Sequence, residues 1–421
     1  MSFPRYPNYK DSGVEWLEEV PEHWAVQPVK SLTTRIASGK TPLGGSETYV
    51  DEGVTFLRSQ NVYDEGLHLD DVAFISNVVD ESMAVSRVQP GDILLNITGA
   101  SIGRSCVVPV EFPPANVNQH VCVIRALKTS QVPFLSWTFK STPVKSQIAH
   151  VQNGAAREGL NFDQIGRMLV AIPPMLEQFA IAAFLDRETA KIDGLVAEQR
   201  RLMDLLREKR QAVISHAVTQ GLNPHAPMKP SGIEGIANVP AHWDVLVIKR
   251  FSTLHRGHDL TDAERTDGSY PVVTSSGING THGSFMAHGP GVVTGRYGST
   301  GRLFYIQDDF WPHNTSLYVS NFHCNHPRFV WYSLQTVDFA AHSAKAAVPG
   351  IDRNDIHVLP VAVPPKDEQG TIVTFLDSEL AKLDTLTAEA QRGIDLLQER
   401  RTALISAAVT GQIDVRGCTP C

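Results

Sequence analysis

Residues 173–196 read PPMLEQFAIAAFLDRETAKIDGLV, and residues 364–387 read PPKDEQGTIVTFLDSELAKLDTLT. The two stretches align without a gap at a constant offset of 191. Each opens on a Pro-Pro pair, and proline is favoured in the first turn of a helix. From Glu177 to Thr219 there is no proline and a single glycine, Gly194. These features predict one long helix in each stretch.

A second repeat precedes each of these stretches along the chain. SGVEWLEEVPEHW at 12–24 returns at 231–243 as SGIEGIANVPAHW, at an offset of 219. Two ungapped matches in the same order indicate an internal duplication. We therefore expect two tandem copies, at about 10–221 and 229–412.

The interiors of the two copies differ in length and in sequence. Trp24 and Pro173 lie 149 positions apart, whereas Trp243 and Pro364 lie 121 positions apart. Constant ends around variable middles are typical of one scaffold that presents two different reading heads. An old duplication whose middles have drifted explains the same pattern, and the sequence leaves both explanations open.

Apolar residues in the long helices follow helical spacing, as at Ile192, Leu195, Leu202 and Leu206. The spacing does not keep a strict heptad, so an antiparallel pair with one helix from each copy is favoured over an isolated parallel coiled coil. At 1.5 Å per residue each helix is about 65 Å long, which is the length of a spacer.

Short apolar or alternating runs bounded by Gly, Pro, Asn and Asp predict that the interiors are mostly β. The expected strands are Val54–Leu57, Asp92–Thr98, Val121–Arg125, Val292–Thr294, Leu303–Ile306 and Leu317–Val319, with short helices at Ser136–Lys140 and Val330–Gln335.

The expected fold class is α+β. Two globular domains of mixed β-sheet and short helices are separated by a pair of long antiparallel helices, with a pseudo-twofold internal repeat. The predicted domains are an N-terminal arm with a first recognition domain at 1–172, a spacer helix at 173–223, a second recognition domain at 224–363, and a second spacer helix with the tail at 364–421.

Composition narrows the class of protein. No apolar run approaches the roughly 20 residues that cross a bilayer, the opening residues lack the apolar stretch of a secretory signal, and five scattered cysteines are too few for a disulfide framework. We therefore expect a cytoplasmic protein without a membrane partner. The net charge of −8 argues against binding nucleic acid by bulk charge, although the interiors are nearly neutral, with 12 basic against 13 acidic residues at 25–172 and 9 against 10 at 244–363.

The stretches that resemble catalytic or cofactor-binding motifs lack residues that those motifs require. Ser38-Gly39-Lys40-Thr41 resembles the end of a phosphate-binding loop, but Thr34 stands where the motif needs glycine and Pro42 where a helix should follow. The Pro-Pro pairs lack the neighbours of a methyltransferase tetrapeptide. His323-Cys324-Asn325-His326 offers metal ligands without the second cluster of a zinc site, so a DNA-facing loop or plain packing is favoured there. We predict no catalytic residue and no metal site.

The remaining signal is recognition. Loops rich in Arg, Asn, Gln, Ser and Thr beside Gly can bring the backbone near a phosphate and place side chains on base edges, although each loop alone also fits an ordinary turn. The predicted DNA-binding residues are Lys40, Thr41, Arg58, Gln60, Asn61, Ser101, Arg104, Asn118, Gln119 and Arg157 in the first copy, and Ser275, Ser276, Arg296, Ser299, Thr300, Arg302, Asn314 and Lys345 in the second.

These motifs together resemble a known family. The stretches at 91–104 and 115–121, the PPxxEQ…FLD segments at 173–186 and 364–377, and the Pro-x-His-Trp entry to each copy are similar to the specificity (S) subunit of type I restriction–modification systems. The resemblance covers nearly the whole chain, and it is most specific in the helical segments.

The resemblance implies a DNA sequence-specificity subunit without catalytic residues. Each target recognition domain would read one half of a bipartite, asymmetric site in double-stranded DNA, and the helices would set the gap between the halves. Two methyltransferase (M) subunits and restriction (R) subunits would be the protein partners. S-adenosylmethionine, ATP and Mg would serve those partners, with no cofactor bound by this chain.

Two other interpretations remain open. One is a specificity subunit of another methyltransferase–nuclease architecture, or of an orphan methylation system without cleavage. The other is a bilobed scaffold protein with no role on DNA.

Overall fold

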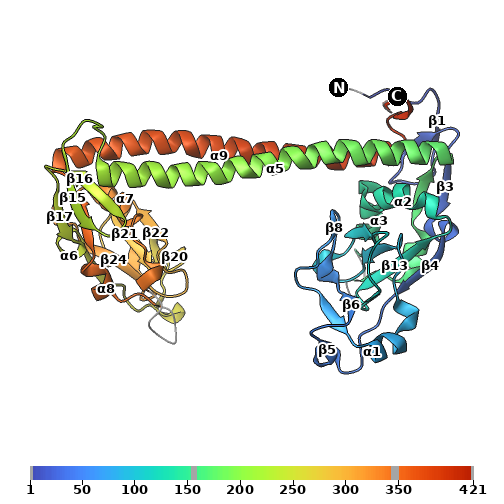
Figure 1. Cartoon of the computed structure of the whole chain (residues 1–421), viewed down its shortest axis with the longest axis horizontal. Helices are drawn as coiled ribbons and strands as arrows, with labels where there is room; N and C mark the ends of the chain where they lie inside the picture. Colours follow the sequence, from blue (N-terminus) through green and yellow to red (C-terminus); the bar gives the residue numbers. More distant parts are fainter. Residues whose placement is uncertain (1–2, 153–158, 343–349, 419–421) are drawn as a thin grey trace. The chain divides into compact units, whose positions relative to one another are not determined.

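A computed structural model describes residues 3–152, 159–342 and 350–418 of the chain (Figure 1). The chain forms two compact units, Met1–Glu198 with Arg392–Cys421, and Gln199–Gln391. Each unit contains one globular domain and one segment of each of the two long helices, α5 (Met175–Gln220) and α9 (Lys366–Val409). The predicted long helices are thus confirmed, with α5 starting two residues before Glu177 and ending one residue after Thr219.

The globular domain of the first unit is built on two four-stranded sheets. The first has the order β11-β10-β13-β4, with antiparallel neighbours throughout. The second has the order β12-β6-β9-β5, in which β12 and β6 are parallel. Their bounds are β4 Thr33–Ser38, β5 Tyr49–Val50, β6 Val54–Leu57, β9 Ala73–Ile75, β10 Ile93–Asn96, β11 Ser105–Val107, β12 Ala115–Val117 and β13 Val121–Ala126.

The globular domain of the second unit has a similar topology, with three strands instead of four in its second sheet. Its first sheet has the order β22-β21-β24-β18, again antiparallel, and its second has the order β23-β19-β20, with β23 and β19 parallel. The bounds are β18 Thr253–Arg256, β19 Tyr270–Thr274, β20 Gly277–His282, β21 Gly291–Gly295, β22 Leu303–Ile306, β23 Trp311–Pro312 and β24 Ser316–Asn321. Interiors that diverge in sequence therefore share the order of the first sheet and of three strands of the second.

Short antiparallel pairs and helices complete each unit. In the first they are β1 Tyr9–Asp11 with β2 Glu19–Pro21, β3 Ala25–Pro28 with β14 Leu169–Ile172, β7 Val62–Tyr63 with β8 Gly66–Leu67, and the helices α1 Asn77–Ser82, α2 Val132–Lys140, α3 Thr142–Gln152 and α4 Phe162–Arg167. In the second they are β15 Met228–Ile233 with β16 Ile236–Pro240, β17 Asp244–Val247 with β25 Pro360–Val363, and the helices α6 Ile248–Phe251, α7 Pro327–Leu334 and α8 Arg353–His357.

An ion pair joins the two long helices within each unit. In the first unit Arg401 Nε lies 2.9 Å from Asp193 Oδ1, and in the second Arg210 Nη1 lies 2.6 Å from Asp384 Oδ1. The offset of 191 relates both members of the first pair to those of the second. The repeated sequence thus encodes the same bridge twice, once in each unit.

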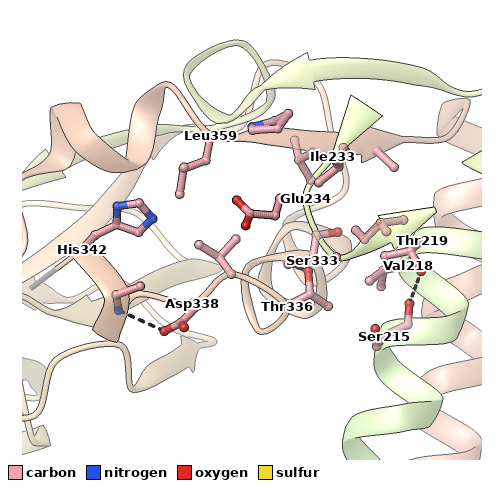
Figure 2. Close-up of a pocket in the computed structure, with 17 residues that line it drawn as sticks. Ser215, Val218, Thr219, Ile233, Glu234, Ser333, Thr336, Asp338, His342 and Leu359 are labelled. Carbon is pink, nitrogen blue, oxygen red and sulfur yellow. Dashed lines mark hydrogen bonds between the residues drawn. The ribbon is translucent and has the colours of Figure 1, made fainter. Parts of the chain in front are cut away.

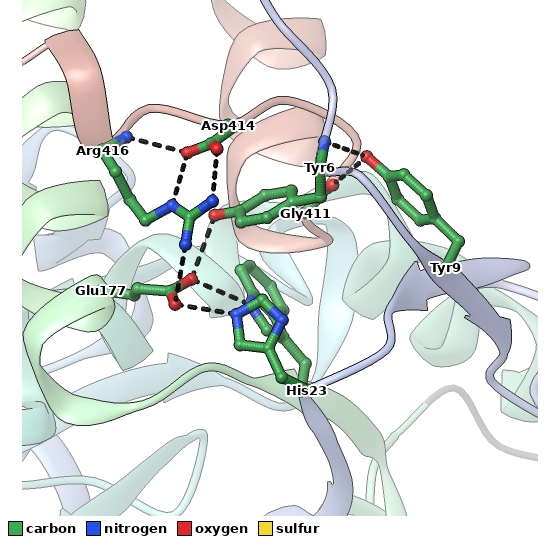
Figure 3. Close-up of polar contacts among 8 residues, drawn as sticks. Tyr6, Tyr9, His23, Glu177, Gly411, Asp414 and Arg416 are labelled. Atoms are coloured by element: carbon green, nitrogen blue, oxygen red, sulfur yellow. Dashed lines mark hydrogen bonds and ion pairs between the residues drawn. The ribbon is translucent and has the colours of Figure 1, made fainter.

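The repeated Glu of the PPxxEQ segment binds the His-Trp pair near the start of each copy. Glu177 accepts hydrogen bonds from Trp24 Nε1 at 3.0 Å and Tyr6 Oη at 3.2 Å, and lies 2.8 Å from His23 Nε2 (Figure 3). In the second unit Glu368 lies 3.1 Å from Trp243 Nε1 and 2.8 Å from the adjacent histidine. The Pro-x-His-Trp and Glu-Gln motifs are therefore two halves of one contact.

The end of the chain reaches the same carboxylate in the first unit. Arg416 pairs with Asp414 at 2.6 Å and lies 3.8 Å from Glu177 Oε1, and Tyr9 Oη donates to Gly411 O at 2.9 Å (Figure 3). Burial and the charge of Glu177 raise the pKa of Tyr6, so its hydroxyl stays a hydrogen-bond donor.

The repeated Asp of the Phe-Leu-Asp segment fixes a domain helix to each long helix. Asp186 accepts from Trp137 Nε1 of α2 at 2.8 Å. Asp377 accepts from Tyr332 Oη of α7 at 2.5 Å and from Arg328 Nε at 2.7 Å. Equivalent carboxylates therefore hold equivalent helices through different donors.

The predicted domain boundaries at 172/173, 223/224 and 363/364 stay a prediction. The two compact units divide both long helices, at 198/199 and 391/392, because each globular domain packs on segments from both. Among the described residues, no helix combines the length and the apolar character that crossing a membrane requires.

Candidate DNA-recognition site

Two pairs of predicted recognition residues lie at matching positions of the first sheet in each domain. In the first domain Leu95 pairs with both Cys122 and Ser105, and in the second Thr294 pairs with both Leu317 and Leu303. Arg104 precedes Ser105 and Arg302 precedes Leu303, so these two arginines are equivalent by register. Gln119 and Asn314 each stand three residues before the partner strand residue, and they are equivalent as well.

Two glycines align the remaining loop. Gly39 N–H donates to Val121 O at 3.4 Å, and Gly257 N–H donates to the equivalent Ser316 O at 3.1 Å. A Cβ on Gly39 would lie 1.6 Å from Val117 O, and one on Gly257 would lie 2.1 Å from His313 O. Both positions therefore require glycine. The residues two positions later, Thr41 and Asp259, are then equivalent.

A cleft of about 450 Å³ gathers three predicted residues of the first domain, Gln60, Ser101 and Arg104. The Arg104 guanidinium lies over the Tyr63 ring at 4.7 Å from its centroid, and Tyr63 in turn stacks on His68 at 4.0 Å. Stacking on an aromatic ring fixes the plane of a guanidinium, which is the group best suited to a guanine edge.

A chain of polar contacts joins two more predicted residues to this cleft. Thr98 Oγ1 lies 2.6 Å from His120 Nδ1, and His120 Nε2 lies 3.0 Å from Gln119 Nε2. The Thr41 hydroxyl contacts Gln119 Oε1. Lys40, next to Thr41, is exposed.

Three other predicted residues of the first domain use their polar groups inside the protein. Asn61 is 1% exposed, accepts from Arg58 N at 2.9 Å and donates to His68 O at 2.9 Å. Asn118 is buried and accepts from His120 N at 3.0 Å. Arg58 donates to Asp71 O at 2.8 Å. These contacts hold the loops in shape, and contact of these residues with DNA stays a prediction.

In the second domain two predicted arginines lie over aromatic rings, and one predicted serine lines a cleft. Arg296 lies over the Tyr297 ring at 4.6 Å, and Arg302 over the Phe304 ring at 5.5 Å. Ser276 lines a separate cleft of about 560 Å³. Ser275, Ser299 and Thr300 lie half-buried in adjoining loops, while the predicted Arg157 and Lys345 lie outside the described residues.

Asp259 is a site residue that the sequence did not single out. Its carboxylate contacts Asn314 Nδ2 and accepts from Arg256 Nη2 at 3.0 Å. The hydrogen bond from Asn314 and the Arg256 charge hold the pKa of the Asp259 carboxyl below its usual value. Burial lowers the pKa of the neighbouring His258, which favours the neutral form of its imidazole. Sequence composition does not mark an acidic residue as a candidate for DNA recognition. Asp259 becomes a candidate only through its contact with Asn314.

The histidine-rich turn before α7 has structural roles. His323 Nε2 lies 2.8 Å from Thr253 Oγ1, and His326 Nδ1 accepts from Arg328 N at 3.2 Å at the start of α7. Within 3–152, 159–342 and 350–418, no group of three His, Cys, Asp or Glu side chains is arranged to hold a metal ion.

A third cleft, of about 500 Å³, lies in the second unit beside α5 (Figure 2). Val218 and Leu359 give it an apolar part, and Glu234 and Asp338 an acidic part. It contains none of the predicted recognition residues, and its negative charge is unfavourable for DNA.

Comparison with known proteins identifies the family. The model of the type I restriction modification DNA specificity domain matches residues 21–199 and 240–394, one match in each copy. The EcoKI type I restriction enzyme specificity subunit of Escherichia coli K12 is 23% identical in a 429-residue alignment with gaps. The alignment covers 94% of this chain and 90% of that protein. The StySPI specificity subunit of Salmonella potsdam is 25% identical over 206 residues, covering 48% of this chain and 44% of that protein.

A solved structure shares the fold. It comes from work on complex assembly and conformational transition of the type I R-M system, with a TM-score of 0.68 at 13% identity, covering 93% of this chain and 98% of that one. This likeness confirms the expected fold class of two recognition domains with long helices. The two family matches together span well over half of this chain. The chain therefore belongs to the type I restriction modification DNA specificity domain family.

Proposed function

We propose that this chain is the DNA sequence-specificity subunit of a type I restriction–modification complex, and that it reads a bipartite, asymmetric site in double-stranded DNA. One observation carries the proposal. The same sheet presents its loops twice, with a shared arginine at 104 and 302 and with different side chains at the other equivalent positions. Different side chains on one frame read different half-sites, which makes the whole site asymmetric.

The chemistry of the loops suits base edges. Arginine pairs in bidentate fashion with guanine, and Asn or Gln amides pair with adenine in the major groove. The nearly neutral charge of both interiors supports a reader whose partners supply much of the contact with phosphates.

The partners complete the activity in this proposal. Two methyltransferase subunits dock on the chain and transfer a methyl group from S-adenosylmethionine to adenine N6, with the adenine turned out of the duplex. Restriction subunits that use ATP and Mg join them for cleavage. The chain itself is not catalytic, binds no cofactor, and works in the cytoplasm.

Methylome sequencing tests the proposal. A host without adenine methylation of its own, carrying this chain and its methyltransferase, is expected to show one bipartite, asymmetric methylated motif. The same host with the methyltransferase alone is the control and is expected to show none. A single contiguous palindrome would contradict the proposal, and cleavage of unmethylated DNA separates a restriction system from an orphan methylation system.

Replacing the equivalent arginines one at a time is expected to relax one half-site each. Arg104→Ala should lose discrimination at one position of the first half-site, and Arg302→Ala at one position of the second, each by about 1–3 kcal/mol. The measurement is the methylated motif of each variant, with Arg200→Ala on an exposed face of α5 as the control. Uniform weakening across all sequences, with a smaller salt dependence, would instead assign these arginines to phosphate contacts.

A further inference from the structure

We propose that Asp259 positions the Asn314 amide to read an adenine in the half-site of the second recognition domain. The inference rests on the proposed function and names a specificity-determining pair within it. Asp259 is a positioning residue, since it acts on DNA through Asn314.

The contact between the two side chains has a single possible polarity. An ionised carboxylate accepts hydrogen bonds and cannot donate them. The Asn314 atom that faces Asp259 must therefore be the amide nitrogen, as the contact with Asn314 Nδ2 shows. Asp259 is itself held by Arg256, whose Nη2 lies 3.0 Å from one carboxylate oxygen and 3.1 Å from the other.

With one N–H of Asn314 bound to Asp259, the rest of the amide presents a fixed set of hydrogen-bonding groups. Asn314 keeps its Oδ1 acceptor and the second N–H of its amide group. Adenine presents an N6 amino donor and an N7 acceptor in the major groove, so it matches both groups at once. Guanine presents two acceptors there, cytosine an amino donor alone, and thymine an acceptor alone. Adenine is therefore the base that this edge selects.

The equivalent amide of the first domain is not constrained in this way. Gln119 contacts the Thr41 hydroxyl and lies 3.0 Å from His120 Nε2. The Thr41 hydroxyl can donate or accept, and the role of His120 Nε2 depends on the tautomer, so both orientations of the Gln119 amide find partners. The carboxylate at 259 is what distinguishes the second domain at this position.

The backbone holds both members of the pair in place. The absence of a Cβ at Gly257 lets its loop pass against the backbone of His313, where a Cβ would lie 2.1 Å from His313 O. The His313 side chain then ties the two loops together, with Nε2 3.3 Å from Leu260 O and Nδ1 3.0 Å from Thr315 Oγ1. Residues next to Asp259 and Asn314 are thus fixed before DNA binds, which reduces the entropy lost on recognition.

The test compares the methylated motifs of four complexes in a host without adenine methylation. They contain the wild-type chain, Asp259→Asn, Asp259→Glu and Asn314→Ala, each with its methyltransferase subunits. Asparagine at 259 both donates and accepts, so it releases the Asn314 amide, whereas glutamate keeps an acceptor-only partner. We expect Asp259→Asn to lower the preference for adenine about ten- to hundredfold at one position of the second half-site. Asp259→Glu should retain most of that preference.

The result is decided by which positions of the methylated motif the two variants relax. Asn314→Ala must relax the same position as Asp259→Asn, and the first half-site must stay unchanged, which also shows that the complex assembles. The inference fails if Asp259→Asn keeps the wild-type preference, if the two variants relax different positions, or if the wild-type base there is not adenine. If Asp259→Asn abolishes all methylation, Asn314→Ala decides alone, because it leaves the Arg256–Asp259 pair intact. A wild-type chain that directs no bipartite methylation would contradict the proposed function itself.

Discussion

Alanine in place of Trp24 is expected to lower the free energy of unfolding of the first unit by about 3–5 kcal/mol. Trp24 is 1% exposed, so its removal leaves a cavity the size of an indole. The substitution also removes the Nε1 donor that lies 3.0 Å from Glu177, a carboxylate that is itself 9% exposed. A buried carboxylate that loses a donor keeps its desolvation cost without the compensating hydrogen bond.

Hydrogen exchange, read separately over the peptides of each unit, measures this effect. Trp24→Phe keeps most of the ring and loses the N–H, so it is the matched control and should cost clearly less than alanine. Trp243→Ala should produce the same loss in the second unit, because Trp243 is fully buried and donates to Glu368 at 3.1 Å. A loss below about 1 kcal/mol for Trp24→Ala, far under the usual range for a buried tryptophan, would contradict the role of this contact.

Gly39→Ala is expected to destabilise the first unit by about 3 kcal/mol and to abolish reading of its half-site. The added Cβ would lie 1.6 Å from Val117 O and 2.8 Å from Asn118 O, and both atoms belong to the backbone. Relief therefore requires the segment after β4 to separate from the end of β12 and the residue that follows it. That movement pulls Thr41 away from Gln119 and removes the contact between the two loops.

Denaturation and the methylated motif together measure this second effect. Gly194→Ala is the control with opposite sign, because Gly194 lies within α5 with nothing within 4 Å of an added Cβ. Alanine there should stabilise the helix by about 0.5–1 kcal/mol. Unchanged stability and an unchanged motif in Gly39→Ala would show that the two backbones do not approach closely.

The repeat and several elements could be predicted from sequence because they depend on local pattern. The strand Leu303–Ile306 was predicted with its observed bounds, and the expected helix at Ser136–Lys140 is the second half of α2, Val132–Lys140. The helix α3, Thr142–Gln152, was missed. A single extended residue, Ser141, separates α3 from α2. So short a break gives no clear sequence signal that a second helix begins after it.

The recognition site was harder to predict because it depends on pairing between distant strands. Gln119 and Asn314 become equivalent through the register of their sheets, and nothing in the neighbouring sequence aligns them. Asn61 stands in a loop of the same composition as the exposed candidates, yet its amide is turned inward to His68 O. Composition identifies a loop that is rich in amides, but the direction of each amide is decided by tertiary contacts.

The interior of each copy begins and ends on neighbouring strands. In the first unit β3 pairs with β14 from Ala25↔Ile172 to Pro28↔Leu169, and in the second β17 pairs with β25 in the same way. An insertion whose ends are adjacent can change in length without moving the frame that carries it. This explains how interiors of different length fit between the same repeated ends, which lie 149 positions apart in the first copy and 121 in the second. Each recognition domain is consequently a cassette, and its exchange by recombination would give the complex a new half-site while leaving the frame unaltered.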